Sequence, residues 1–280
     1  MLLSSKFYTT KMISSGTMDL TSLMAATCEV AKKAGYFIRQ ERASFDWSKI
    51  EHKGFNDLVS YVDKEAEKIL VAGLGNLLPE ADFITEEGTA GRNNKVYTWI
   101  IDPLDGTTNF IHGLPVFAVS IGLRKDDEIV LGVVYEVNAD ECFFAAKGLG
   151  AFCNGKPIHV SKASSLSQSL IATGFPYSAF QKIDDYLLAL KTLMQQTHGL
   201  RRMGSAAIDL CYVACGRMDG YFEYNLQPYD VAGGSIIVKE AGGQVTDFRN
   251  GEDYIFGREI LATNGLIHDE FYGLLRSIWG

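Results

Sequence analysis

The stretch that decides the fold runs from Trp99 to Pro115 and reads WIIDPLDGTTNFIHGLP. Its first three residues are apolar and predict a β-strand. Two aspartates follow, Asp102 and Asp105, on a loop that Pro103 stiffens, so their carboxylates lie close together at a strand end and favour a bound cation. An Asx-type turn explains the same residues by backbone preference alone. Both interpretations stay open on these residues.

The segment after the aspartates favours an anion beside the cation. Residues 106–109, GTTN, can open a short helix. A helix N-terminus presents unpaired N–H groups and a positive dipole end, which bind phosphate. Mg²⁺ prefers carboxylates, water and phosphate oxygens, whereas Zn²⁺ requires His or Cys ligands, and residues 102–109 contain neither. The loop therefore suits Mg²⁺ next to a phosphate group.

Three further motifs accompany this loop along the chain. They are DLVSYVD at 57–63, TEEG at 85–88 and YDVAGG at 229–234. With DPLDGTTNF they resemble, in order, the inositol monophosphatase family of Mg²⁺-dependent, lithium-sensitive phosphatases. The resemblance extends from about residue 18 to the C-terminus, and it implies an α/β protein with the layered αβαβα sugar-phosphatase fold.

The resemblance implies a metal site built from hard oxygen donors. The implied ligands are the side chains of Glu86, Asp102, Asp105 and Asp230 and the backbone carbonyl of Leu104. They would hold two or three Mg²⁺ ions, for which Mn²⁺ can substitute. Two structural alternatives stay open: Asp230 as a helix cap and Glu86 as an ordinary solvated loop residue.

The resemblance also implies catalytic roles. Asp63 and Thr107 match the pair that orients and deprotonates the attacking water, with Glu86 as a third catalytic residue. The backbone amides of Gly106 and Thr107 would hold the phosphate. On the residues alone, a surface carboxylate on a helix that Asp57 caps is the alternative interpretation of Asp63.

The alcohol half of the substrate would lie against a separate group of residues. Glu223 matches the family's glutamate that hydrogen-bonds ring hydroxyls, and His112 is expected to brace the loop rather than to bind metal. The full set of implied substrate-binding residues is Gly106, Thr107, Gly204, Ser205, Ala206, Glu223 and Asp230.

The implied reaction is hydrolysis of myo-inositol monophosphate. Tyr229, Thr85 and Ser205 stand where the family commonly has tryptophan, glycine and threonine, so histidinol phosphate, fructose bisphosphate and nucleotide phosphates remain alternative substrates. A transcription-associated binding role is a further alternative, because one bacterial relative binds the transcription machinery. The family also suggests a homodimer.

The amino-acid composition limits which binding partners and which cellular compartment we expect. The chain has 280 residues, 47% of them hydrophobic, and a formal net charge of −8. This acidity argues against nucleic-acid and membrane partners, which need clustered Lys and Arg. Five cysteines without metal-site spacing predict a reduced, cytoplasmic protein. Residues 1–17 are expected to be a disordered leader.

Hydrophobic periodicity divides the chain into two halves of a single unit, an α+β half over 18–165 and an α/β half over 166–280. The first half is expected to contain helices at 20–38 and 58–78 and an antiparallel meander of strands at 116–124, 129–136 and 142–146. The second half is expected to alternate strands at 170–173, 199–202, 218–224, 244–247 and 260–263 with helices at 180–196, 205–215, 230–241 and 266–279. The site is expected in the crevice between the halves.

Overall fold

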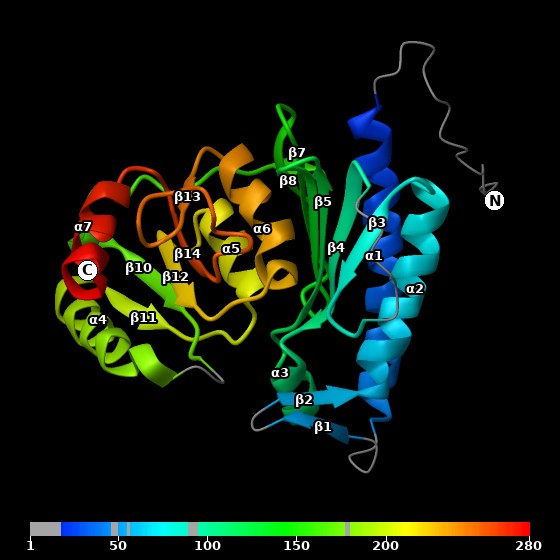
Figure 1. Cartoon of the computed structure of the whole chain (residues 1–280), viewed down its shortest axis with the longest axis horizontal. Coiled ribbons are helices and arrows are strands. Elements are labelled where there is room, and N and C mark those ends of the chain that lie inside the picture. Colours follow the sequence, from blue (N-terminus) through cyan, green and yellow to red (C-terminus); the bar gives the residue numbers. More distant parts are fainter. Residues whose placement is uncertain (1–17, 46–49, 55–56, 89–94, 177–179) are drawn as a thin grey trace.

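Two long helices form one outer layer of the protein. The computed structural model describes residues 18–45, 50–54, 57–88, 95–176 and 180–280, so the expected leader at 1–17 lies outside the described residues. Helix α1 (Leu20–Ala43) begins at Asp19, whose carboxylate accepts the N–H groups of Thr21 and Ser22. Helix α2 (Tyr61–Leu77) packs along α1 (Figure 1).

The expected start of the second helix is wrong by three residues. The segment before it pairs as an antiparallel hairpin, β1 (Ile50–Gly54) with β2 (Asp57–Ser60). Asp57 therefore lies in a strand, and the expectation that it caps α2 is wrong. The strand pairing of these residues with the adjacent segment overrides their helical periodicity, which shows only the spacing of apolar side chains and not strand pairing.

A seven-stranded sheet forms the next layer, in the order β3-β4-β5-β6-β7-β8-β9. Its first pair is parallel and the others are antiparallel, which confirms the expected meander. The strands are β3 (Asp82–Thr85), β4 (Tyr97–Asp105), β5 (Ala118–Lys125), β6 (Glu128–Glu136), β7 (Glu141–Ala146), β8 (Gly150–Cys153) and β9 (Lys156–Pro157). The short helix α3 (Thr107–His112) follows β4 directly.

A five-stranded sheet forms the other half, in the order β11-β10-β12-β14-β13. It contains β10 (Leu170–Thr173), β11 (Gly199–Arg201), β12 (Gly220–Tyr224), β13 (Gln244–Thr246) and β14 (Glu259–Thr263). Its helices are α4 (Ile183–Gln196), α5 (Ala206–Ala214), α6 (Pro228–Glu240) and α7 (His268–Trp279), with 3₁₀ helices η2 (Leu166–Gln168) and η3 (Phe180–Lys182). The expected alternation of this half is confirmed.

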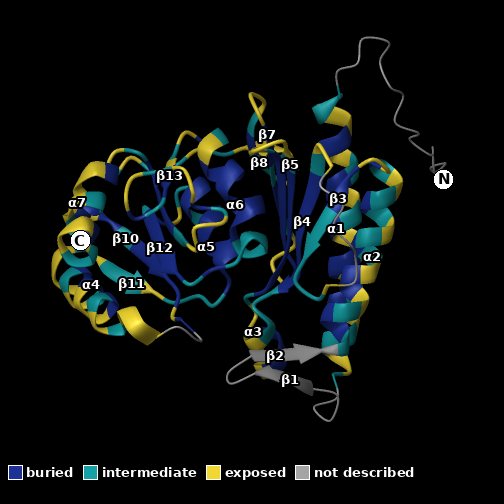
Figure 2. Cartoon of the chain, in the orientation of Figure 1, coloured by how far each residue is buried: buried dark blue, intermediate teal, exposed yellow. Residues whose placement is uncertain are grey.

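Helices α5 and α6 lie between the two sheets, and α4 and α7 cover the far face of the five-stranded sheet (Figure 1). The order of layers is therefore α, β, α, β, α, and the expected layered fold is confirmed. Figure 2 shows that the middle helices are buried, whereas the outer helices present exposed residues to the surface. In α6, eight consecutive residues, Val231 to Val238, are buried, as expected for a helix enclosed on all sides.

Glycines allow α6 to approach the seven-stranded sheet closely. A Cβ atom on Gly132 of β6 would lie 2.3 Å from the carbonyl oxygen of Gly233, and one on Gly122 of β5 would lie 2.7 Å from the Cβ of Ala232. On the other side of the helix, a Cβ on Gly234 would lie 2.6 Å from that of Leu210 in α5. The two glycines of YDVAGG thus let one helix pack tightly against two neighbours.

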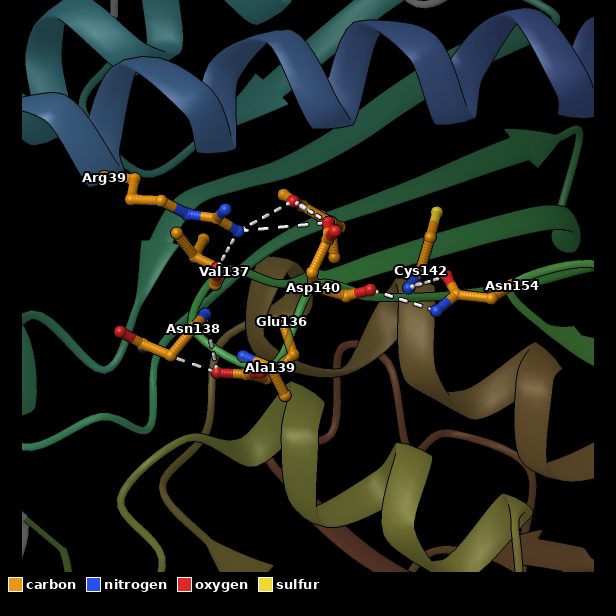
Figure 3. Close-up of polar contacts among 9 residues, drawn as sticks. Arg39, Glu136, Val137, Asn138, Ala139, Asp140, Cys142 and Asn154 are labelled. Carbon is orange, nitrogen blue, oxygen red and sulfur yellow. Dashed lines mark hydrogen bonds and ion pairs between the residues drawn. The ribbon is translucent and has the colours of Figure 1, made fainter.

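Polar side chains fix the turn between β6 and β7 against α1 (Figure 3). Arg39 of α1 donates to the carbonyl of Val137, and the Glu136 carboxylate accepts the N–H groups of Asn138 and Ala139. Burial raises the pKa of Glu136, although these hydrogen bonds oppose the rise. The amide of Asn154 donates to the carbonyl of Asp140 over 3.0 Å, so helix, turn and β8 are joined.

All five cysteines are free thiols. Cys28, Cys142 and Cys211 are buried, and Cys153 and Cys215 are partly buried, so these thiols lie mainly within apolar surroundings. Among the described helices, none is both long and apolar enough to cross a membrane.

The close approach of α6 makes a stability prediction. The variant Gly132→Ala should be destabilised by about 1–3 kcal/mol, because its methyl group meets backbone that has no room to move. The control Gly273→Ala places a methyl in helix α7 with no atom within 4 Å, and it should be neutral or stabilising by up to about 1 kcal/mol. Urea unfolding followed by circular dichroism measures both; equal effects of the two variants would contradict the packing argument.

Candidate active site

A β-bulge directs Asp102 and Asp105 to the same face of the sheet. Asp102 pairs with Ser120 and Asp105 with Ala118, so a step of three residues on β4 opposes a step of two on β5. Residues three apart in a regular strand point to opposite faces, and one extra residue corrects this. The Ser120 hydroxyl donates to the carbonyl of Tyr229 over 3.4 Å, which identifies this face as the one that α6 covers.

Asp102 is the most deeply enclosed carboxylate of this face. Its side chain is 2% exposed, and one oxygen accepts the N–H of Leu104 over 2.9 Å. Burial raises the pKa of Asp102 well above its ordinary value, and the negative charges of Glu86, Asp105 and Asp230 raise it further. Three partly buried carboxylates therefore act on the buried Asp102.

Asp105 joins the bulge to helix α5. Its Oδ2 accepts the Ser205 hydroxyl over 2.6 Å and the N–H of Ala207 over 2.7 Å. Burial raises the pKa of Asp105, and these hydrogen bonds counteract the rise. Ser205 is also the N-cap of α5, with its oxygen 3.3 Å from the N–H of Ile208. One hydroxyl thus both begins a helix and positions a predicted metal ligand.

Asp230 lies at the third position of α6 and completes a capping box. Its Oδ2 accepts the backbone N–H of Gln227 over 2.7 Å. Burial raises the pKa of Asp230 well above its ordinary value, and the charge of Asp105 raises it further. One carboxylate oxygen of Asp230 therefore acts in the capping box, as the capping interpretation requires. The metal-ligand interpretation stays open, because it can use the other oxygen.

Glu86 follows directly after β3, at the edge of the same acidic group. The next residue, Glu87, donates its N–H to Glu67 Oε2 over 2.7 Å. Glu67 lies on α2 and its side chain is completely buried. This buried carboxylate fixes the turn that presents Glu86.

Thr107 and Asp63 meet as the sequence predicts. The Thr107 hydroxyl lies 2.8 Å from Asp63 Oδ1 and 2.9 Å from the carbonyl oxygen of Leu104. Because a hydroxyl has one proton, these two oxygens share it. Asp63 is 1% exposed, so the surface-carboxylate interpretation is wrong. The contact joins α2 to the bulge that carries both aspartates.

Gly106 and Asn109 shape the loop after the bulge. Gly106 is the N-cap of α3 with φ of 93°, and a Cβ there would lie 2.9 Å from the carbonyl oxygen of Val116. The Asn109 amide donates to the carbonyls of Val116 and Met203 over 2.7 and 2.9 Å. This side chain brings the segment before Gly204 to the loop, whereas His112 lies exposed at the end of α3.

A pocket opens between the bulge and the five-stranded sheet. It is lined by Asp105 from the first half and by residues of the second half, which agrees with the expected crevice. Glu223 lies on its wall, 8% exposed, and accepts the Tyr221 hydroxyl over 2.6 Å. The other predicted residues that line it are Gly204, Ser205, Ala206 and Asp230.

The chemistry of the acidic group fits a hard divalent cation. Its donors are all oxygen atoms, and the mutual repulsion that raises the pKa of Asp102 would become attraction around a cation. In the part of the chain that the structure describes, no three His, Cys, Asp or Glu side chains are gathered closely enough to enclose an ion. Metal ligation by these residues therefore stays a prediction.

Four residues of this region escaped the sequence analysis. Glu67 and Asn109 position the loops, and their signal was weak because buried polar residues look like surface residues in a helical pattern. Asp209 of α5 is 1% exposed, and its Oδ1 has no hydrogen-bond partner among the described residues. Arg202 lines the pocket, and it stands two residues before the predicted Gly204.

The fold and the pocket define an αβαβα protein with buried carboxylates between its two sheets. The sequence matches the inositol monophosphatase family over residues 19–279, and the chain belongs to that family. This confirms the resemblance of its motifs and implies phosphatase activity.

Three similar proteins show the range within the family. The chain is 42% identical over 237 residues to a "Putative Nus factor SuhB" of Neisseria meningitidis, which covers 84% of the chain and 91% of that protein. It is 38% identical to an "Inositol-1-monophosphatase" of Mesorhizobium japonicum, and that match covers 89% of the chain and 94% of the relative. The crystal structure of the extragenic suppressor protein SuhB from Bartonella henselae matches with a TM-score of 0.87 at 40% sequence identity. The match covers 91% of the chain and 98% of the SuhB chain.

The buried Glu223 makes a prediction on pH and stability. Burial raises its pKa from 4.5 to about 7, so its contribution to stability is present below pH 4.5 and is lost as the pH rises through about 7. As the pH rises from 5 to 8, the free energy of unfolding should therefore fall in the wild type. In Glu223→Gln it should fall by less, and the difference between the two falls should be on the order of 2 kcal/mol.

Urea unfolding at several pH values in the presence of chelator measures this difference. The exposed Glu252→Gln removes the same charge, and it should follow the wild type. Parallel pH curves for wild type and Glu223→Gln would show that Glu223 titrates alike in the folded and unfolded chains.

Proposed function

We propose that the chain hydrolyses myo-inositol monophosphate to inositol and phosphate, depends on Mg²⁺ and is inhibited by Li⁺. The observation that carries this proposal is the composition of one pocket, which Asp105, Asp230 and Glu223 all line. The two aspartates suit a cation with a phosphate group, and the buried Glu223 carboxylate suits a polyol. Membership of the family supports the same chemistry.

Residues at different positions in the pocket region would carry out different parts of the reaction. Asp63 and Thr107, 2.8 Å apart, hold a proton acceptor next to the bulge, where the attacking water would lose its proton. The backbone N–H groups of Gly106 and Thr107, at the start of α3, would bind phosphate oxygens. When bound to the carboxylates and the Leu104 carbonyl, Mg²⁺ supplies positive charge for the transferring phosphoryl group and acidifies the attacking water.

The family leaves other substrates as alternatives, namely histidinol phosphate, fructose bisphosphate and nucleotide phosphates. A relative named as a putative Nus factor favours a second candidate function, a transcription-associated binding role beside the enzymatic one. Affinity purification from the source cell, with and without RNase, tests that role. The homodimer and the cytoplasmic location stay predictions, and light scattering of the purified protein tests the first.

The metal dependence is tested with Asp102→Asn. Chelator should abolish hydrolysis by the wild type and added Mg²⁺ should restore it, because the buried carboxylates repel one another without a cation. The variant should lose several orders of magnitude in kcat yet remain folded by circular dichroism. In a melting experiment, Mg²⁺ at about 100 times its Kd should stabilise the wild type by roughly 2.7 kcal/mol and the variant much less. An active Asp102→Asn would contradict the assignment.

The paired oxygens of Thr107 and Asp63 give a second kinetic prediction. Thr107→Val keeps the shape of the side chain and removes the hydroxyl, so kcat should fall by about 10²-fold or more, the usual contribution of a positioned proton-transfer group. Thr107→Ser keeps the hydroxyl and should retain most of the activity. Steady-state kinetics at saturating Mg²⁺ compares them, and similar rates for Val and Ser would remove Thr107 from the proton-transfer step.

A further inference from the structure

The pocket wall contains one cation that no motif of the sequence assigned. Of the described residues that line the pocket, Arg202 alone is basic. It follows β11 directly and faces the same space as Glu223. Its positive charge lowers the pKa of both Glu223 and Asp105 against the effect of burial, so the guanidinium lies within electrostatic range of both carboxylates.

Aromatic rings hold the Arg202 head group on the wall. The guanidinium carbon lies 5.4 Å from the centre of the Phe175 ring, a cation–π distance. Phe175 in turn meets Tyr186 edge to face, with ring centres 6.5 Å apart. Tyr186 is 1% exposed, and its hydroxyl contacts the carbonyl of Gly174 and the hydroxyl of Thr173. Arg202 therefore rests on an anchored surface.

Two glycines leave the space that the two charged groups occupy. A Cβ on Gly174 would lie 1.9 Å from Glu223 Oε2. A Cβ on Gly204 would lie 2.7 Å from Asn109 Nδ2 and 3.0 Å from Arg202 Nη1. Any other residue at position 174 would displace the carboxylate, and one at position 204 would crowd both Asn109 and the guanidinium. The Arg202 head group therefore lies directly against the backbone that carries Gly204.

The charges of the wall favour neutral hydroxyls over a second anion. A guanidinium only donates hydrogen bonds, and an ionised carboxylate only accepts them. A hydroxyl does both, so two adjacent hydroxyls complement a guanidinium beside a carboxylate. A second anionic group on the substrate would instead meet the carboxylate of Glu223 in the same pocket, which would repel it when ionised.

We propose that Arg202 is a specificity-determining residue, whose guanidinium donates hydrogen bonds to the ring hydroxyls of a phosphorylated polyol while Glu223 accepts from an adjacent one. This rests on the proposed function, because it concerns the alcohol half of the same substrate. It assigns to Arg202 a direct contact with substrate, distinct from any structural support of the pocket.

The test compares Arg202→Gln with wild type on two esters, myo-inositol 1-phosphate and cyclohexyl phosphate, which keeps the six-membered ring and lacks ring hydroxyls. For the inositol ester, kcat/KM should fall about 10- to 100-fold, mainly through a higher KM, the range for a hydrogen bond to a charged group. For cyclohexyl phosphate it should stay within about twofold of wild type. Arg202→Lys should recover part of the loss.

A double variant tests whether Arg202 and Glu223 act together, and a control variant tests the effect of charge alone. The double variant with Glu223→Gln should lose less on the inositol ester than the two single losses combined, because both act on one hydroxyl-bearing ring. Arg201→Gln removes the same charge from the exposed neighbouring residue and should leave both kcat/KM values unchanged. Melting temperatures of all variants show whether each remains folded.

Four results would overturn the proposal. They are an equal loss on both esters, an unchanged inositol kcat/KM, full additivity with Glu223→Gln, and, with fructose bisphosphate assayed as a third substrate, a loss confined to that ester, which would make Arg202 a residue that selects a second anionic group. If the wild type hydrolyses neither ester with Mg²⁺, the proposed function fails. Calorimetric titration with myo-inositol 1-phosphate then still decides on Arg202, since the proposal requires at least tenfold weaker binding by Arg202→Gln.

Discussion

The tight packing of α6 against the seven-stranded sheet is the constraint on which the site depends. Backbone and small side chains make this contact: Gly122 and Gly132 from the strands, Ala232 and Gly233 from the helix. Because the helix and the sheet approach so closely at these positions, the first turn of α6 brings Asp230 within electrostatic range of Asp102. A wider separation would weaken the interaction between these carboxylates.

The concentration of buried negative charge is costly for the folded chain. Burial and mutual repulsion both raise the pKa values of Asp102 and Asp230, so in the metal-free protein these groups oppose folding whenever they are ionised. Hydrogen bonds from Ser205, Ala207 and Leu104 offset part of this cost. The arrangement is understandable as a site that a cation completes, and functional sites commonly show such strain.

Polar contacts between distant segments assemble the pocket around this group. Thr107 joins α2 to the bulge, Asn109 joins the loop to the segment before Gly204, and Ser205 joins α5 to Asp105. Each of these side chains is short and lies at the start of a helix or within its first turn, where it is held firmly. Glu223 comes from the five-stranded sheet and Arg202 is the residue after one of its strands, so different layers of the fold contribute to the lining of the pocket.

The sequence by itself determined the family, the layered fold, and most elements of the second half to within three residues. The resemblance of the motifs implied the family and the layered fold and predicted Asp63, Thr107 and the four carboxylates as site residues, whereas local periodicity and turn residues predicted the individual helices and strands. Only the tertiary structure decided that Asp57 lies in a hairpin strand, that a bulge turns Asp102 and Asp105 to one face, and that Glu67 and Arg202 belong to the site. The hairpin of Asp57 depends on pairing between neighbouring segments, and the other features depend on which distant segments meet; neither kind of pairing leaves a periodic pattern in one sequence.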